Sequence, residues 1–127
     1  MKIMLISRDK ELFNSLLKLQ KEISLPVELF SGAEDPLDIL SEICSENASL
    51  VILDDDFIKP GSAVLLKAIR KVKESLDIIF LTSNDSIELG KEITSLSVQF
   101  YAIKPISSKE LMQSINSIIK YKSKQIN

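Results

Sequence analysis

Three short apolar runs of the sequence are each followed directly by a polar side chain that can take part in chemistry. These runs and their polar neighbours are LVIL with Asp54, Asp55 and Asp56, IIFL with Thr82, and FYAI with Lys104. A carboxylate, a hydroxyl and an ammonium that meet in space can carry and hold a phosphoryl group, because the ammonium neutralises its oxygens and the hydroxyl hydrogen-bonds to one of them. The sequence therefore predicts phosphoryl chemistry on an aspartate, provided that the three runs lie side by side.

The pattern of the whole chain predicts this arrangement, because short aliphatic runs alternate with longer segments of helical period. Strands are expected at 2–6, 27–29, 50–53, 78–81 and 100–103, and helices at 9–23, from Asp35, at 62–74, around 89–96 and from Ser107. Asp35 before Pro36, and Ser107 with Glu110, are typical of helix starts. The apolar face of the second helix is expected to comprise Leu37, Leu40, Ile43 and Cys44.

Five repeats of a strand and a helix predict an α/β fold with a doubly wound parallel sheet and helices on both faces. Short right-handed connections favour the strand order 2-1-3-4-5, the flavodoxin-like arrangement. Ligands of such sheets bind beyond the carboxyl ends of the strands, near the point where the winding reverses. We expect one domain over residues 1–127, with the polar strand ends at its functional edge.

The composition excludes several other functions. The chain has 127 residues and a net charge of −2, which gives no general attraction to nucleic acid or to an anionic membrane. It has no histidine and a single cysteine, Cys44, so histidine catalysis, the usual zinc sites and an internal disulfide are excluded. Cys44 is expected to be a small buried side chain and Arg70 a solvated one. Since no segment reads as a leader or membrane span, we expect a cytoplasmic protein.

The segments LVILD at 50–54, FLTS at 80–83 and FYAIKP at 100–105 resemble the receiver domain of bacterial two-component response regulators, over essentially the entire chain. The resemblance implies that Asp54 accepts phosphate from a histidine kinase with Mg²⁺ nearby. It also implies that Thr82 is the switch hydroxyl, Lys104 binds the phosphate and Tyr101 is the aromatic that moves inward on activation. The bond from Lys104 to Pro105 is expected to be the cis peptide of that family.

The choice among the three aspartates depends on register. Side chains alternate along a strand, so Asp54 and Asp56 should point one way and Asp55 the other. Asp54 directly follows the apolar run, as the acceptor of the family does. Pro60, however, lies four positions after Asp56 and six after Asp54, whereas the family usually has proline four positions after its acceptor. We favour Asp54, and the alternative is that the three acids only solvate a loop.

The sequence departs from the family after the first strand, where two adjacent acids normally hold Mg²⁺. Here these positions are Ser7 and Arg8, and a guanidinium offers no lone pair to a metal. We therefore expect Mg²⁺ binding at Asp9, Asp54 and Asp56 to be weak or absent. Arg8 could pair with Asp54 inside the pocket or turn to solvent. Asp9 could partly replace the missing acids as a metal ligand, but we favour a role at the start of the following helix.

The predicted function is that of a receiver domain in a phosphorelay, acting through protein contacts and not as an enzyme. Its expected partners are a histidine kinase or phosphotransfer protein and a downstream protein that docks on the fourth helix, fifth strand and fifth helix. We expect no direct contact with nucleic acid or membrane, and a monomer or weak homodimer. One alternative is a phosphorylation-independent pseudo-receiver. Another, a flavin- or nucleotide-binding enzyme, is disfavoured because SRDKE after the first strand lacks glycine.

Overall fold

The computed structural model describes residues 2–23, 26–29, 35–58 and 62–126. The strands are β1 (Ile3–Ile6), β2 (Val27–Leu29), β3 (Leu50–Asp54), β4 (Asp77–Thr82) and β5 (Phe100–Ile103). The helices are α1 (Lys10–Ile23), α2 (Pro36–Glu46), α3 (Asp55–Ile58), α4 (Ser62–Val72), α5 (Ile87–Thr94) and α6 (Ser108–Ile126). The short helix α3, which follows β3 without a break, was not predicted.

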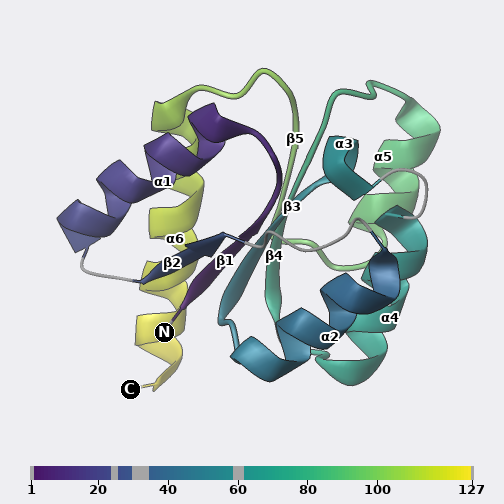
Figure 1. Cartoon of the computed structure of the whole chain (residues 1–127), viewed down its shortest axis with the longest axis horizontal. Coiled ribbons are helices and arrows are strands. Elements are labelled where there is room, and N and C mark those ends of the chain that lie inside the picture. The colour runs from purple at the N-terminus through teal and green to yellow at the C-terminus, as the bar shows by residue number, and fades with distance from the viewer. Residues whose placement is uncertain (1, 24–25, 30–34, 59–61, 127) are drawn as a thin grey trace.

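The five strands form one parallel sheet in the order β2-β1-β3-β4-β5, which confirms the predicted fold. Helices α1 and α6 cover one face, and α2, α4 and α5 cover the other (Figure 1). All strands run in one direction, so their carboxyl ends share one edge. The segments that follow β1, β3, β4 and β5 therefore meet at this edge.

Two apolar cores, one on each face of the sheet, hold these layers together. Alternate residues of each central strand point to opposite faces, so Leu5 and Ile52 pack under α1 and α6 while Met4 and Val51 pack under α2 and α4. The strand residues from Ile3 to Ile6 and from Leu50 to Leu53 are essentially inaccessible to solvent. Burial on both sheet faces explains why these strands are apolar at every position.

Side-chain caps fix where the helices begin. The carboxylate of Asp35 accepts from the amide of Leu37 at 2.9 Å, with Pro36 at the first helical position. The hydroxyl of Ser107 accepts from the amide of Glu110 at 3.1 Å at the start of α6. Both predicted helix starts are confirmed. Since α6 begins immediately after the residues that follow β5, its cap also helps to place the carboxyl end of that strand.

Two predicted burial assignments are wrong. Cys44 is exposed, and Leu37 on the same helix is 73 % exposed. Helix α2 buries Ile43, as predicted, together with Ile39. A step of one residue rotates a side chain by about 100° around a helix, so Cys44 lies beside the buried stripe and not within it.

Arg70 is also placed differently from the prediction that it is merely solvated. Its guanidinium donates to the carbonyl oxygens of Leu76 at 2.6 Å, Leu96 at 2.9 Å and Ser97 at 2.8 Å. These carbonyls belong to the segments that precede β4 and β5. Burial lowers the pKa of Arg70 from its ordinary value, although the charge of Asp77 opposes this effect. Arg70 thus ties α4 to two loops at the end of the molecule opposite the polar strand ends.

None of the helices in the part of the chain that the structure describes combines the length and the apolar content of a membrane span.

Candidate functional site

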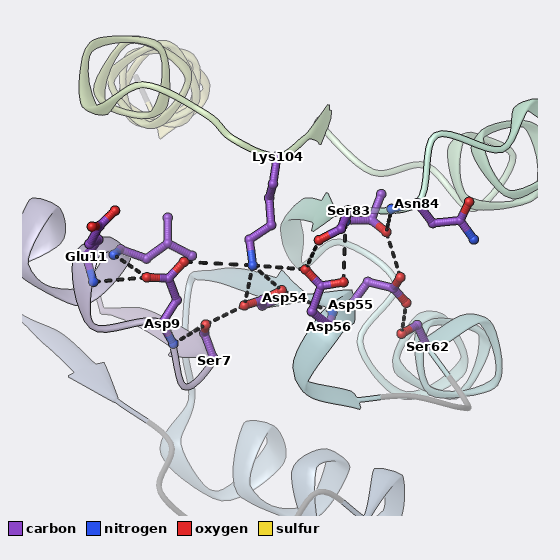
Figure 2. Close-up of polar contacts among 12 residues, drawn as sticks. Ser7, Asp9, Glu11, Asp54, Asp55, Asp56, Ser62, Ser83, Asn84 and Lys104 are labelled. Carbon is purple, nitrogen blue, oxygen red and sulfur yellow. Dashed lines mark hydrogen bonds and ion pairs between the residues drawn. The ribbon is translucent and has the colours of Figure 1, made fainter.

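The carboxylate of Asp54 is the centre of the polar cluster at the carboxyl edge of the sheet (Figure 2). It ends β3 and is only 2 % exposed. The ammonium of Lys104 donates to both of its oxygens at 2.9 Å, the hydroxyl of Ser7 donates to Oδ2 at 2.5 Å, and the amide of Asp56 donates to Oδ1 at 3.1 Å. A buried carboxylate with this many donors is held in one orientation.

Lys104 follows β5 directly and extends from that strand end toward the acids (Figure 2). Its ammonium lies 3.2 Å from a carboxylate oxygen of Asp56 and 3.8 Å from one of Asp9, in addition to its contact with Asp54. Burial lowers the pKa of Lys104, but hydrogen bonds and charges of Asp54 and Asp56 outweigh burial and leave the pKa raised above its ordinary value. Lys104 is therefore a cation at neutral pH.

Asp56 joins the end of β4 to this cluster. Its Oδ1 accepts from the backbone amide of Ser83 at 3.4 Å, and its Oδ2 accepts from the hydroxyl of the same residue. Although the chain turns into α3 after Asp54, Asp54 and Asp56 both face Lys104, as strand alternation predicted. The segments after β3, β4 and β5 are therefore linked through polar side chains.

Asp55 points away from Lys104 and forms a second, separate cluster. It is 6 % exposed, and its Oδ2 accepts from the hydroxyl of Thr82 at 2.6 Å. Its Oδ1 accepts from the hydroxyl of Ser62 at the start of α4. The structure thus brings Lys104 onto Asp54, but it places the hydroxyl of Thr82 on Asp55 and not on Asp54.

Tyr101 lies on the same side of the sheet as this second cluster. Its ring stacks on Phe80 of β4 with centroids 5.8 Å apart, and its hydroxyl is near Gly90 of α5. Phe80 and Thr82 are two residues apart on β4, so their side chains leave the same face. Burial raises the pKa of Tyr101, and the charge of Asp55 raises it further.

Ser7 and Asp9 have defined contacts after β1. The hydroxyl of Ser7, which donates to Asp54, accepts from the amide of Asp9 at 2.9 Å. Oδ1 of Asp9 accepts from the amides of Glu11 at 3.0 Å and Leu12 at 3.3 Å, so Asp9 caps the start of α1. Its other oxygen is the one that faces Lys104. The helix-start role of Asp9 is confirmed.

Arg8 is exposed, and its guanidinium lies over the ring of Phe57 at 5.2 Å from the centroid. Arg8, Phe57, Asp9, Asp54 and Asp56 line one cavity of about 230 Å³. The position of Arg8 is a cation–π contact at the rim of this cavity, which neither predicted alternative included. Through this cavity, Asp54 can be reached from the surface of the molecule.

Pro105 follows Lys104 through a cis peptide bond, as predicted. It lines a second cavity of about 640 Å³ between α1 and the start of α6, together with Asp9 and Lys104. Pro60, the residue that favoured Asp56 as acceptor, lies outside the described residues.

No protein-family model matches the chain. The transcriptional regulatory protein LytR of Staphylococcus aureus (strain N315) is 27 % identical over 127 residues, which are 100 % of this chain and 50 % of that protein. The chain thus spans about half the length of these curated relatives.

Two solved structures with the same fold are named as response-regulator receiver domains. The receiver domain protein from Methanospirillum hungatei JF-1 matches with a TM-score of 0.80 at 19 % identity, over 98 % of this chain and 97 % of that chain. The receiver domain of the Francisella response regulator 1452 matches with a TM-score of 0.77 at 23 % identity, over 95 % and 98 % of the two chains. The chain has the fold of response-regulator receiver domains. The resemblance predicted from the strand ends is confirmed.

Three acids lie at the carboxyl edge of the sheet, where the resemblance to receiver domains implies a Mg²⁺ site. Each of them already has a partner: Asp9 caps α1, and Asp54 and Asp56 contact Lys104. Among the described residues, the group of three acidic side chains with ligand oxygens within 4.8 Å of one another is instead Glu28, Glu42 and Glu46, remote in sequence from the strand ends. Two of these, Glu28 and Glu46, are paired with Lys2.

Two members of the candidate site were not predicted from the sequence. Ser62 was read only as the start of a helix, and Asp55 was set aside because it points away from Lys104. Strand alternation correctly gave the direction of Asp55 but did not show what lies on that side. A buried carboxylate requires donors, so three successive acids after a buried strand were the available signal that hydroxyls such as those of Ser62 and Thr82 lie nearby.

Proposed function

We propose that Asp54 is the phosphoacceptor of this receiver domain and that its phosphorylation changes which proteins the domain binds. The observation that supports the proposal is the buried carboxylate of Asp54 with the ammonium of Lys104 at 2.9 Å from both oxygens. Lys104 would neutralise the phosphoryl oxygens, and Ser7 would supply a further hydrogen bond. In this proposal, residues 1–127 act as one signalling unit, cytoplasmic and without enzymatic turnover of its own.

The acceptor step needs a donor that carries an activated phosphoryl group. A carboxylate oxygen of Asp54 would attack the phosphorus of a phosphohistidine, forming a P–O bond while the P–N bond breaks. The electron pair of that bond leaves with the imidazole, which takes a proton from solvent. Lys104 stabilises the charge on the transferred group throughout, because its raised pKa keeps it protonated. The cavity of about 230 Å³ at Asp54 is the proposed entrance for the donor.

The partners proposed for this domain are a histidine kinase or phosphotransfer protein and a downstream effector, without direct binding to nucleic acid or membrane. The effector would dock on α5, β5 and α6, which correspond to the predicted fourth helix, fifth strand and fifth helix. Ile87 on α5 and Ile103 on β5 support this surface, because they are 76 % and 46 % exposed. We propose a monomer or a weak homodimer as the resting state.

We further propose that Mg²⁺ binding is weak or absent, because Ser7 and Arg8 stand where receiver domains have an acid pair. Arg8→Asp should raise the affinity for Mg²⁺ at least about tenfold, since it removes a cation and adds a carboxylate beside the cavity at Asp54. Amide shifts in a Mg²⁺ titration measure this change.

Arg8→Gln is the matched control for that titration, because it removes the cation without adding a ligand of comparable strength. Equal Mg²⁺ affinity of Arg8→Asp and the unmodified chain would contradict the interpretation of Arg8.

Incubation of the chain with acetyl phosphate, with and without Mg²⁺, tests the proposed function. Intact-mass analysis should show the addition of one phosphoryl group, and amide shifts should change around Asp54 and Thr82. A chain that gains no mass under either condition, and shows no amide shifts with beryllofluoride, would refute phosphorylation. The fold of each sample is checked by its amide spectrum before the reaction.

A further inference from the structure

The single hydroxyl proton of Thr82 is already in use. Thr82 is inaccessible to solvent, and its hydroxyl donates to Asp55 at 2.6 Å while accepting from the amide of Asn84 at 3.0 Å. A threonine hydroxyl has one proton to donate. Thr82 cannot donate to a phosphoryl oxygen on Asp54 without first breaking its hydrogen bond to Asp55.

Breaking that bond would leave Asp55 with one fewer donor. Asp55 is 6 % exposed, and the hydroxyl of Ser62 is its other side-chain donor in the described residues. Loss of a hydrogen bond to a buried carboxylate is strongly unfavourable, because water cannot replace the missing donor. Release of Thr82 is therefore unfavourable unless another donor replaces it.

The structure contains a buried donor that is not in use. The hydroxyl of Tyr101 is, among the side chains that the structure describes, the buried polar group without a hydrogen-bond partner. Its ring stacks on Phe80, two residues before Thr82 on β4, so it lies on the face toward which Thr82 points. Burial raises the pKa of Tyr101, and the charge of Asp55 raises it further, which shows that the two groups interact.

We propose that Asp55 is a positioning residue that holds Thr82 away from Asp54 in the resting state and exchanges it for the hydroxyl of Tyr101 when Asp54 carries a phosphoryl group. This inference rests on the proposed function of Asp54. In the resting state Asp55 accepts from Ser62 and Thr82. In the phosphorylated state it accepts from Ser62 and Tyr101, and Thr82 donates to a phosphoryl oxygen. The number of donors to Asp55 is the same in both states.

The exchange links the acceptor site to the surface formed by α5 and β5. Tyr101 belongs to β5, and its hydroxyl is next to Gly90 of α5. A move of this hydroxyl toward Asp55 would change the packing between α5 and β5, the proposed docking elements. The hydrogen bond from Thr82 to Asp55 thus sets the free energy needed to pass from the resting to the phosphorylated arrangement, because it must break first.

A double-mutant cycle between Asp55→Asn and Thr82→Ala tests the proposal, with beryllofluoride at fixed Mg²⁺ as the phosphoryl mimic. Asp55→Asn weakens the hydrogen bond that Thr82 donates to residue 55 and so makes Thr82 easier to release. The resulting increase in beryllofluoride affinity should be about fivefold larger when Thr82 is present than in the Thr82→Ala background. Removal of the negative charge of Asp55 favours binding of the beryllofluoride anion in both backgrounds. The ratio of the two affinity changes, measured with Thr82 and with Thr82→Ala, therefore isolates the effect that depends on Thr82.

Asp56→Asn is the charge-matched control, because it removes an equal charge from the adjacent position and its carboxylate contacts Ser83 and Lys104. Its effect on beryllofluoride affinity should be the same, within about twofold, with and without Thr82→Ala. Equal effects of Asp55→Asn in both backgrounds would refute the proposal, as would coupling of the same size for Asp56→Asn.

Tyr101→Phe tests the second half of the exchange and leaves Asp55 intact. Its hydroxyl has no hydrogen-bond partner among the residues that the structure describes, so its loss should leave the free energy of unfolding unchanged and lower beryllofluoride affinity about threefold. Unchanged affinity would refute the exchange. If the unmodified chain fails to bind beryllofluoride at all, the proposed function fails together with the exchange; if it binds and the cycle is additive, the exchange alone fails.

Discussion

Asp54→Asn is expected to abolish phosphoryl incorporation from acetyl phosphate, to below about one hundredth of the yield of the unmodified chain. The amide keeps the size and the hydrogen-bonding shape of the side chain but removes the nucleophilic carboxylate. Lys104 and Ser7, which donate to Asp54 at 2.9 and 2.5 Å, can still donate to the remaining oxygen. Intact-mass analysis after a fixed incubation measures the yield.

Asp56→Asn is the control for the acceptor assignment. Asp56 faces the same ammonium as Asp54, at 3.2 Å, but is more exposed, with 27 % of its side chain accessible against 3 % for Asp54. Asp56→Asn should still be phosphorylated. Peptide mapping that finds the phosphoryl group on Asp56 in the unmodified chain would show that the register favoured by Pro60 is correct and that Asp54 is not the acceptor.

Lys104→Met is expected to lower the free energy of unfolding by about 2 kcal/mol, which is less than the roughly 3–5 kcal/mol of breaking a fully buried ion pair because the ammonium is partly exposed. The substitution leaves Asp54 buried without its cation and removes the charge that separates Asp54 from Asp56. Urea denaturation of both proteins at neutral pH measures the difference.

Two further variants separate charge from packing at Lys104. Lys104→Met combined with Asp54→Asn should recover most of the lost stability, because the buried charge is then gone as well. Lys104→Arg should lose less than Lys104→Met, since it keeps the cation. If the double variant is no more stable than Lys104→Met, the loss comes from packing and not from the unpaired carboxylate.

The pH dependence of this pair has a defined sign. The pKa of Lys104 is raised in the folded chain, so its contribution to stability is complete below the ordinary lysine pKa and is lost as the pH rises through the raised value. The difference in stability between the unmodified chain and Lys104→Met should therefore be constant near neutral pH and shrink only in strongly alkaline solution.

The sequence by itself determined the fold and the meeting of Asp54 with Lys104. Apolar runs at β1, β3 and β4 predict central strands of a parallel sheet, and a parallel sheet brings the residues after its strands to one edge. Strand alternation also predicted that Asp54 and Asp56 share a side and that Asp55 faces the other. These properties follow from backbone periodicity, which is local and therefore readable from the order of residues.

Only the tertiary structure decided which partner each of these side chains has. Thr82 donates to Asp55, Arg8 lies over Phe57, and Arg70 donates to carbonyls of the segments before β4 and β5. Periodicity gives the face of an element on which a side chain lies but not the neighbours that approach that face. A polar side chain chooses among donors and acceptors within about 3 Å, and those neighbours are set by how the layers pack against the sheet.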